Sequence, residues 1–151
     1  MKTFNYLLAL VLILLSQFAW SADTSSTPSV DPELAKAREL IEKKDWGNAI
    51  QTLESYTRSK PGNADGFNLL GYSYRNLKRY DESLVAYEKA LKLDPKHRGA
   101  HEYIGVAYIQ MGQLGKAKEH LDALDKICLF SCEEYRDLKK AYEEASKSKG
   151  K

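Results

Sequence analysis

The stretch of sequence that decides the fold runs from Ala64 to Pro95 and reads ADGFNLLGYSYRNLKRYDESLVAYEKALKLDP. Phe67, Leu70 and Tyr74 lie three and seven residues apart, which predicts one apolar face of a first helix. Gly71 has no side chain, so a second helix can approach the first closely at this point. The second helix is predicted by another apolar stripe at helical spacing: Tyr80, Leu84, Tyr87 and Leu91. Asp94-Pro95 ends it, because proline cannot continue a helix.

The same pattern returns at a period of 34 residues on both sides of this stretch. On the C-terminal side the equivalent positions hold His101, Ile104, Gly105, Tyr108, Ala117, Leu121 and Leu124. On the N-terminal side they hold Leu40, Trp46, Ala49, Leu53, Tyr56 and Pro61, with Lys36-Ala37 in place of Leu-Gly. We therefore predict three helix-turn-helix units, at about 30–63, 64–97 and 98–131.

The aromatic, Leu-Gly, Tyr, Ala and Pro spacing of the middle unit resembles the tetratricopeptide repeat (TPR). The resemblance covers most of the chain beyond its N-terminal segment. It implies an all-α solenoid, and in its bacterial secreted form a non-enzymatic module that binds a peptide or partner protein in a concave groove. The resemblance is specific for fold and carries little information about which partner is bound.

A different pattern follows the third unit. Ser131 and Glu134 have the spacing of a capping box, and an apolar stripe begins at Tyr135. We expect a capping helix over 132–145 that covers the last apolar face of the stack. The residues 146–151 are polar and basic and are expected to be a disordered tail.

The N-terminus has the three parts of a secretory signal. Lys2 precedes the apolar run 6–15, and the small residues Ala19 and Ser21 are correctly spaced for cleavage. We expect a signal peptide at 1–21, a polar linker at 22–30 and a TPR domain at 31–145, secreted into the bacterial periplasm. An uncleaved membrane anchor is the alternative, because Thr3 to Ala22 carries no charge.

Charge argues against nucleic acid as the partner. Without the signal, 22 Lys and Arg face 21 Asp and Glu, a net charge of +1, whereas nucleic-acid binders usually carry a strong positive excess. No nucleophile motif and no glycine-rich phosphate loop is present in the sequence. We therefore expect no enzymatic activity, no cofactor, no metal site, and no membrane contact after cleavage; the oligomeric state is left open.

The two cysteines, Cys128 and Cys132, form an even pair in a chain expected to be exported, which favours a disulfide bond. A redox or metal-handling role for this pair is the alternative function, and a membrane-anchored assembly factor is another. His97 and His101 have a zinc-compatible spacing of four, but His101 occupies a packing position of the repeat. We therefore expect packing and surface roles for these histidines.

The TPR resemblance places certain first-helix residues on the concave groove, where they would contact a partner. They are Arg38, Ile41, Asn68, Leu69, Tyr72, Arg75, Asn76, Glu102, Tyr103, Val106, Ile109 and Gln110. TPR domains that bind the C-terminal carboxylate of chaperones use Lys, Asn and Arg at groove positions. Here those positions hold Leu34, Arg38, Leu69, Gly99 and Tyr103. That class of ligand is therefore not supported by the sequence.

Overall fold

The computed structural model describes residues 31–149, and these residues are entirely helical apart from turns. The helices are α2 (Pro32–Glu42), α3 (Trp46–Ser59), α4 (Ala64–Asn76), α5 (Tyr80–Leu93), α6 (Arg98–Gln110), α7 (Leu114–Ile127) and α8 (Glu133–Lys149). The predicted all-α class of helix-turn-helix units is confirmed.

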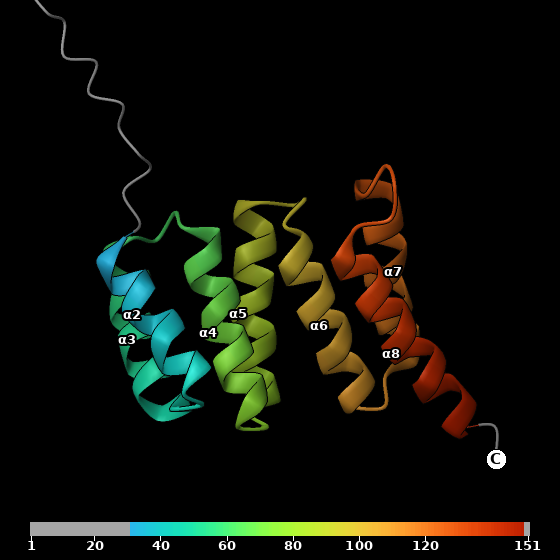
Figure 1. The fold of residues 1–151 in the computed structure, drawn as a ribbon, viewed down its shortest axis with the longest axis horizontal. Coiled ribbons are helices and arrows are strands. Elements are labelled where there is room, and N and C mark those ends of the chain that lie inside the picture. Colours follow the sequence, from blue (N-terminus) through green and yellow to red (C-terminus); the bar gives the residue numbers. More distant parts are fainter. Residues whose placement is uncertain (1–30, 150–151) are drawn as a thin grey trace, which may run out of the picture.

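The helices stack in two layers along one direction (Figure 1). The first helices of the units, α2, α4 and α6, form the inner layer, and α8 continues this layer at the C-terminal end. The second helices, α3, α5 and α7, lie behind them and form the outer layer. A stack of this kind offers the inner layer as one continuous surface.

Local side-chain chemistry sets the starts of the inner helices. Asp31 accepts a hydrogen bond from the backbone N–H of Glu33, and Asn63 accepts one from Gly66 at 2.8 Å. At the start of α6 the capping group is His97, whose Nδ1 accepts from the N–H of Ala100 at 3.1 Å. Each cap satisfies a donor that the helix itself leaves without a partner.

The turn inside each unit uses one residue in the left-handed region, at the same position of the repeat. These residues are Lys44 (φ 57°), Lys78 (φ 60°) and Gly112 (φ 73°). Only the third unit has the glycine that this conformation favours. The lysines adopt it because the helix pairs on either side fix the geometry of the turn.

The core follows the predicted stripes and is continuous from unit to unit. Tyr56 and Leu53 are buried in the first unit, Tyr87 in the second, and Leu124 and Leu138 at the C-terminal end. These large side chains are at most 1% exposed. Because each unit buries its apolar face against its neighbour, no single unit could be stable alone.

The capping helix differs from its prediction at both ends. The helix α8 begins at Glu133 and continues to Lys149, so the expected tail at 146–151 is helical over most of its length. Ser146 lies within the helix, and its hydroxyl donates a hydrogen bond to the carbonyl of Tyr142 at 2.8 Å. The capping box is absent, since Ser131 has φ 47° and Glu134 is instead paired with Arg98.

The predicted signal peptide (1–21) and linker (22–30) lie outside the described residues. Between residues 31 and 149, no helix is both long and apolar enough to cross a membrane.

Candidate functional site

The inner layer carries a cluster of two tyrosines and one arginine between α4 and α6. The rings of Tyr72 and Tyr103 lie 5.0 Å apart between centroids. The guanidinium carbon of Arg75 lies 5.2 Å from the Tyr72 ring centroid and 5.9 Å from that of Tyr103. Such cation–π contacts hold the guanidinium plane in one orientation. All three side chains are partly exposed, so a ligand on the inner face would meet a rigid aromatic and cationic surface.

Tyr72 connects this cluster to the preceding unit through Trp46. The two rings lie 5.9 Å apart in an edge-on arrangement. On the other side Tyr103 is 6.4 Å from Tyr87, which belongs to the core. The repeat pattern predicts Trp46 only in the packing of the first unit, because it begins an outer helix. Its contact with the Tyr72 ring depends on how two successive units stack.

An acidic region borders the cluster on the side of α8. Burial, together with the nearby carboxylates of Asp137 and Glu134, raises the pKa of Glu102 to about 7, and Arg75 opposes the shift. Both neighbouring acids belong to α8, a helix that the sequence analysis treated only as a cap. This end of the inner face therefore gains negative charge as Glu102 loses its proton near neutral pH.

We expect the Glu102→Gln variant to be more stable than wild type at pH 8 and about equally stable at pH 5. The folded pKa lies above the ordinary value of 4.5. The folded chain therefore retains a proton that the unfolded chain has already released, and wild-type stability falls as pH rises from 4.5 to 7. Allowing for solvent screening of a partly exposed group, the gain at pH 8 should be about 1–2 kcal/mol.

Urea unfolding of both proteins at pH 5, 6, 7 and 8, followed by circular dichroism, measures this difference. His120 changes the stability of the folded chain with pH in the opposite direction. Burial lowers its pKa to about 4, so its contribution is lost as pH falls below 6.5. It is the same in both proteins and cancels in the comparison. Parallel stability curves for the two proteins would contradict the assignment.

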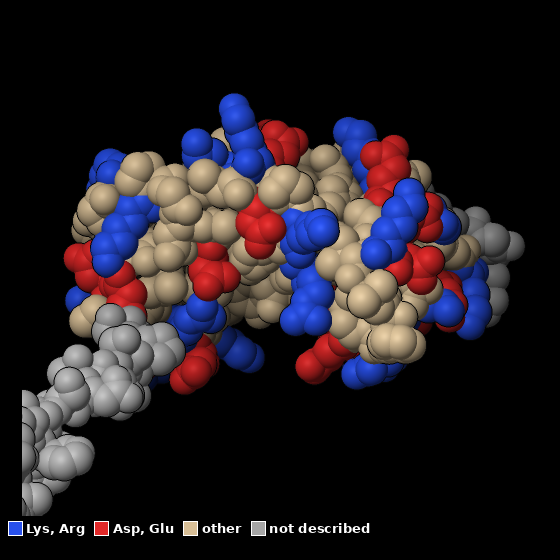
Figure 2. Space-filling view, turned by 90° about the horizontal axis from the view of Figure 1, so that it is seen from above, with Lys and Arg blue, Asp and Glu red and all other residues tan. Residues whose placement is uncertain are grey.

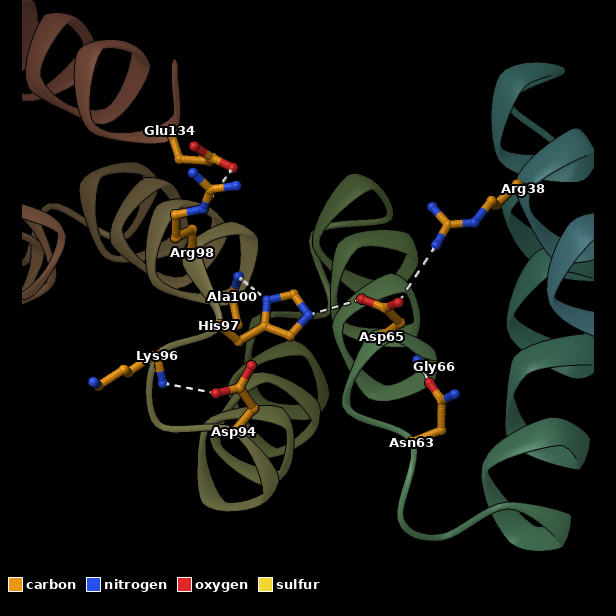
Figure 3. A network of polar contacts seen from close by, with 10 residues as sticks. All are labelled: Arg38, Asn63, Asp65, Gly66, Asp94, Lys96, His97, Arg98, Ala100 and Glu134. Carbon is orange, nitrogen blue, oxygen red and sulfur yellow. Dashed lines mark hydrogen bonds and ion pairs between the residues drawn. The ribbon is translucent and has the colours of Figure 1, made fainter. Parts of the chain in front are cut away.

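A chain of polar contacts runs along the edge of the inner layer where its helices begin (Figure 3). Asp65 on α4 receives Arg38 from α2 at 3.9 Å and Nε2 of His97 at 3.0 Å. Because Nδ1 of His97 accepts from Ala100, its Nε2 carries the proton and donates to Asp65. Arg98 on α6 reaches Glu134 on α8 at 3.5 Å. Each contact joins neighbouring units, so together they position the inner helices relative to one another.

Two of the predicted groove residues do not face the groove. Leu69 is 9% exposed and belongs to the core of the first two units, with Leu34 and Tyr74. Asn68 is 6% exposed and lies against the start of α6, where its Nδ2 is 3.3 Å from the position that a Cβ of Gly99 would occupy. The approach of α6 to α4 covers both positions, which helical spacing within α4 could not reveal.

The capping helix accounts for two further differences. Val106 and Ile109 pack against the cluster of Leu121, Leu124 and Leu138, so α8 occupies the surface that they were expected to offer. Ile41 is partly buried against the first core cluster. Arg38, Asn76 and Gln110 are exposed. The structure therefore brings together Tyr72, Arg75, Glu102 and Tyr103 from the predicted set.

The cysteines and histidines do not belong to the cluster of Tyr72, Arg75 and Tyr103. Cys128 and Cys132 are joined by a disulfide bond in the loop between α7 and α8. His97 and His101 have different partners, since His101 faces His120 with their Nδ1 atoms 3.1 Å apart. Within residues 31–149, no group of three or more His, Cys, Asp or Glu is arranged to hold a metal ion.

Acidic and basic side chains are intermixed over the face of the molecule seen from above in Figure 2. No single sign of charge dominates this view, in keeping with the near balance of charges in the sequence.

Comparisons with known proteins agree with this architecture. Residues 64–97 match the family model of the tetratricopeptide repeat. The peroxisomal targeting signal receptor of Saccharomyces cerevisiae is 32% identical over 107 residues, which is 70% of this chain and 17% of the receptor. Superkiller protein 3 of the same yeast is 27% identical over 88 residues, 58% of this chain and 6% of that protein. The chain thus spans less than a fifth of the length of either relative.

Among solved structures, the TPR2B domain of yeast Sti1 in its Hsp70 peptide complex superposes with a TM-score of 0.71 at 23% identity. The match covers 77% of this chain and 94% of that domain. The type III secretion translocator chaperone SycD of Yersinia enterocolitica also gives 0.71, at 15% identity, over 79% of this chain and 84% of SycD. These similarities concern the fold.

Proposed function

We propose that this tetratricopeptide-repeat protein is a non-enzymatic interaction module that binds a peptide or partner protein on its inner face. The observation that carries the proposal is the cluster of Tyr72, Arg75 and Tyr103, in which the two rings contact each other and the guanidinium lies over both. Tyrosine and arginine dominate binding hot spots, because they combine a large contact area with directed hydrogen bonds. A surface that is already ordered also loses little conformational entropy when a ligand binds.

Charge and shape narrow the class of ligand. The cluster supplies one cation, Arg75, and the adjacent acidic region contains Glu102, Glu134 and Asp137. A ligand with apolar anchor residues and charges of both signs fits this surface better than a purely acidic or basic one. The Sti1 domain was solved with an Hsp70 peptide, which supports peptide binding by this fold. The chaperone-type carboxylate clamp is not supported, because Leu34 and Leu69 occupy two of its positions and are buried.

Site-specific photo-crosslinking tests the proposal and identifies the partner together. A benzophenone amino acid replaces Asn76, which is exposed at the end of α4 beside Tyr72. The matched control carries the same group at Glu88, which is exposed on α5 of the outer layer. We expect an adduct at position 76 that is absent at position 88. Adducts of equal yield at both positions would argue against an inner-face site.

We further propose that the chain acts after export, in the bacterial periplasm. The signal-like segment 1–21 and the disulfide between Cys128 and Cys132 support this, because such bonds persist in oxidising compartments. The intact mass of the exported protein is expected to correspond to a chain beginning at Ala22 or Asp23. A full-length, membrane-bound product would instead favour the anchored alternative.

A further inference from the structure

Two large apolar side chains project from the loop that joins α7 to α8. Leu129 is 87% exposed and Phe130 is 95% exposed. They lie between Cys128 and Cys132, so the disulfide closes the base of the loop. We refer to Leu129 and Phe130 as the knob. A loop this short and cross-linked cannot fold its apolar residues back onto the core, so the knob stays in solvent unless another surface covers it.

An apolar pocket of about 500 Å³ lies between α4 and α5. Its apolar walls are Phe67, Leu70, Tyr74, Val85 and Ala86. Val85, which lines this pocket, is 68% exposed. Phe67, Leu70 and Tyr74 share one face of α4, and Tyr72 lies on the opposite face, since a helix advances about 100° per residue. The pocket is therefore separate from the inner-face cluster.

We propose that the knob of one copy of this chain inserts into the α4–α5 pocket of a second copy. Each chain carries both surfaces, and the two are complementary in character, one a projecting apolar pair and the other an apolar hollow. The knob cannot reach the pocket of its own chain. The disulfide-closed loop sits at the C-terminal end of the stack, and α6 separates α7 and α8 from the α4–α5 hairpin (Figure 1).

Charges beside the two surfaces favour this pairing. Asp81, Glu82 and Lys89 border the pocket, and Glu82 is paired with Arg79 of its own helix end at 2.8 Å. Arg136 donates a hydrogen bond to the carbonyl of Ser131, the residue after the knob, at 3.3 Å, and Glu133 is exposed at the start of α8. Asp81 and Lys89 beside the pocket can therefore face Arg136 and Glu133 beside the knob. Complementary rim charges select the partner and speed association more than they strengthen it.

A contact between two different patches leaves a free knob and a free pocket at the ends of every dimer. The assembly is therefore head-to-tail and can grow beyond two chains. The area buried by two side chains is small, so we expect association in the range of about 10–100 µM, typical of weak contacts. The proposal does not depend on ligand binding at the inner face.

Two single substitutions separate the halves of the contact. Phe130→Asp places a charge in the knob and leaves the pocket intact, whereas Val85→Asp places a charge in the pocket and leaves the knob intact. Both side chains are mostly exposed, so neither change should affect folding, which circular dichroism checks. The experiment is sedimentation velocity of the full chain, purified as the expressing cell delivers it, from about 10 µM to 1 mM, the range that spans a weak contact. Tyr72→Ala, on the inner face, is the control.

Wild type and Tyr72→Ala should show an average mass that rises with concentration beyond that of a dimer. Each aspartate variant alone should remain monomeric. An equimolar mixture of the two should form a dimer that grows no further, because only one intact knob and one intact pocket can meet. A monomeric wild type at about 1 mM, a mixture that stays monomeric, or association that persists in both single variants would each overturn the proposal.

Discussion

Replacing Gly71 with leucine is expected to lower the free energy of unfolding by about 3 kcal/mol, near the upper end for overpacked cores. A Cβ at this position would lie 2.6 Å from Cδ1 and 2.9 Å from Cγ of Tyr87. The ring cannot move away, because Tyr87 is 0% exposed. The backbone cannot move easily either, since the carbonyl of Gly71 accepts a buried hydrogen bond from Ser83 at 2.8 Å. The gain in helix propensity, about 1 kcal/mol, is smaller than this cost.

The matched control is Gly115→Leu on α7. A Cβ there meets no atom within 4 Å, and the residue is exposed. The same substitution should therefore leave stability unchanged or raise it slightly through helix propensity. Urea unfolding of the two variants measures the contrast. If Gly71→Leu were as stable as Gly115→Leu, the packing of α4 against α5 would have to differ from the one described.

The sequence predicts this contact because Gly71 on the first helix and a large apolar residue, Tyr87, on the second lie at the spacing of the repeat. The helix boundaries are also predictable from the sequence, because Asp31, Asn63 and Asp94-Pro95 start or end a helix by local interactions. Local chemistry was less reliable at Ser131, where the capping-box spacing is present and the box is not formed. There the disulfide and the pairing of Glu134 with Arg98 determine the path of the chain.

The candidate site was predictable only in part, because it depends on contacts between units. Helical spacing places Asn68, Leu69 and Tyr72 on neighbouring parts of one helix, and it cannot say which of them α6 will cover. The position of α8 is a second example. Its apolar stripe predicts a cap, but only its docking on α6 shows that it covers Val106 and Ile109. The same docking brings Glu134 and Asp137 close enough to shift the pKa of Glu102.

If the inner face binds a partner, replacing Tyr72 or Tyr103 with alanine should weaken binding by about 2 kcal/mol each, the threshold of a hot spot. The two rings contact each other and share Arg75. The effects should therefore be less than additive in the double variant, because each single change already releases the guanidinium. Tyr72→Phe keeps the ring and should retain most of the affinity if stacking, rather than the hydroxyl, carries the contact.

Affinity is measured by isothermal titration with the partner segment recovered by crosslinking at position 76. Tyr103 also touches the buried Tyr87, so each variant is first shown to be folded at the titration temperature. Tyr135→Ala on α8 is the control. Tyr135 packs against the C-terminal core cluster, so its replacement should lower stability while leaving affinity unchanged. Equal affinity of wild type and the Tyr72/Tyr103 double variant would move the binding site away from the inner face. In that case the α4–α5 pocket and the knob, which these two substitutions leave intact, would be the next surfaces to test.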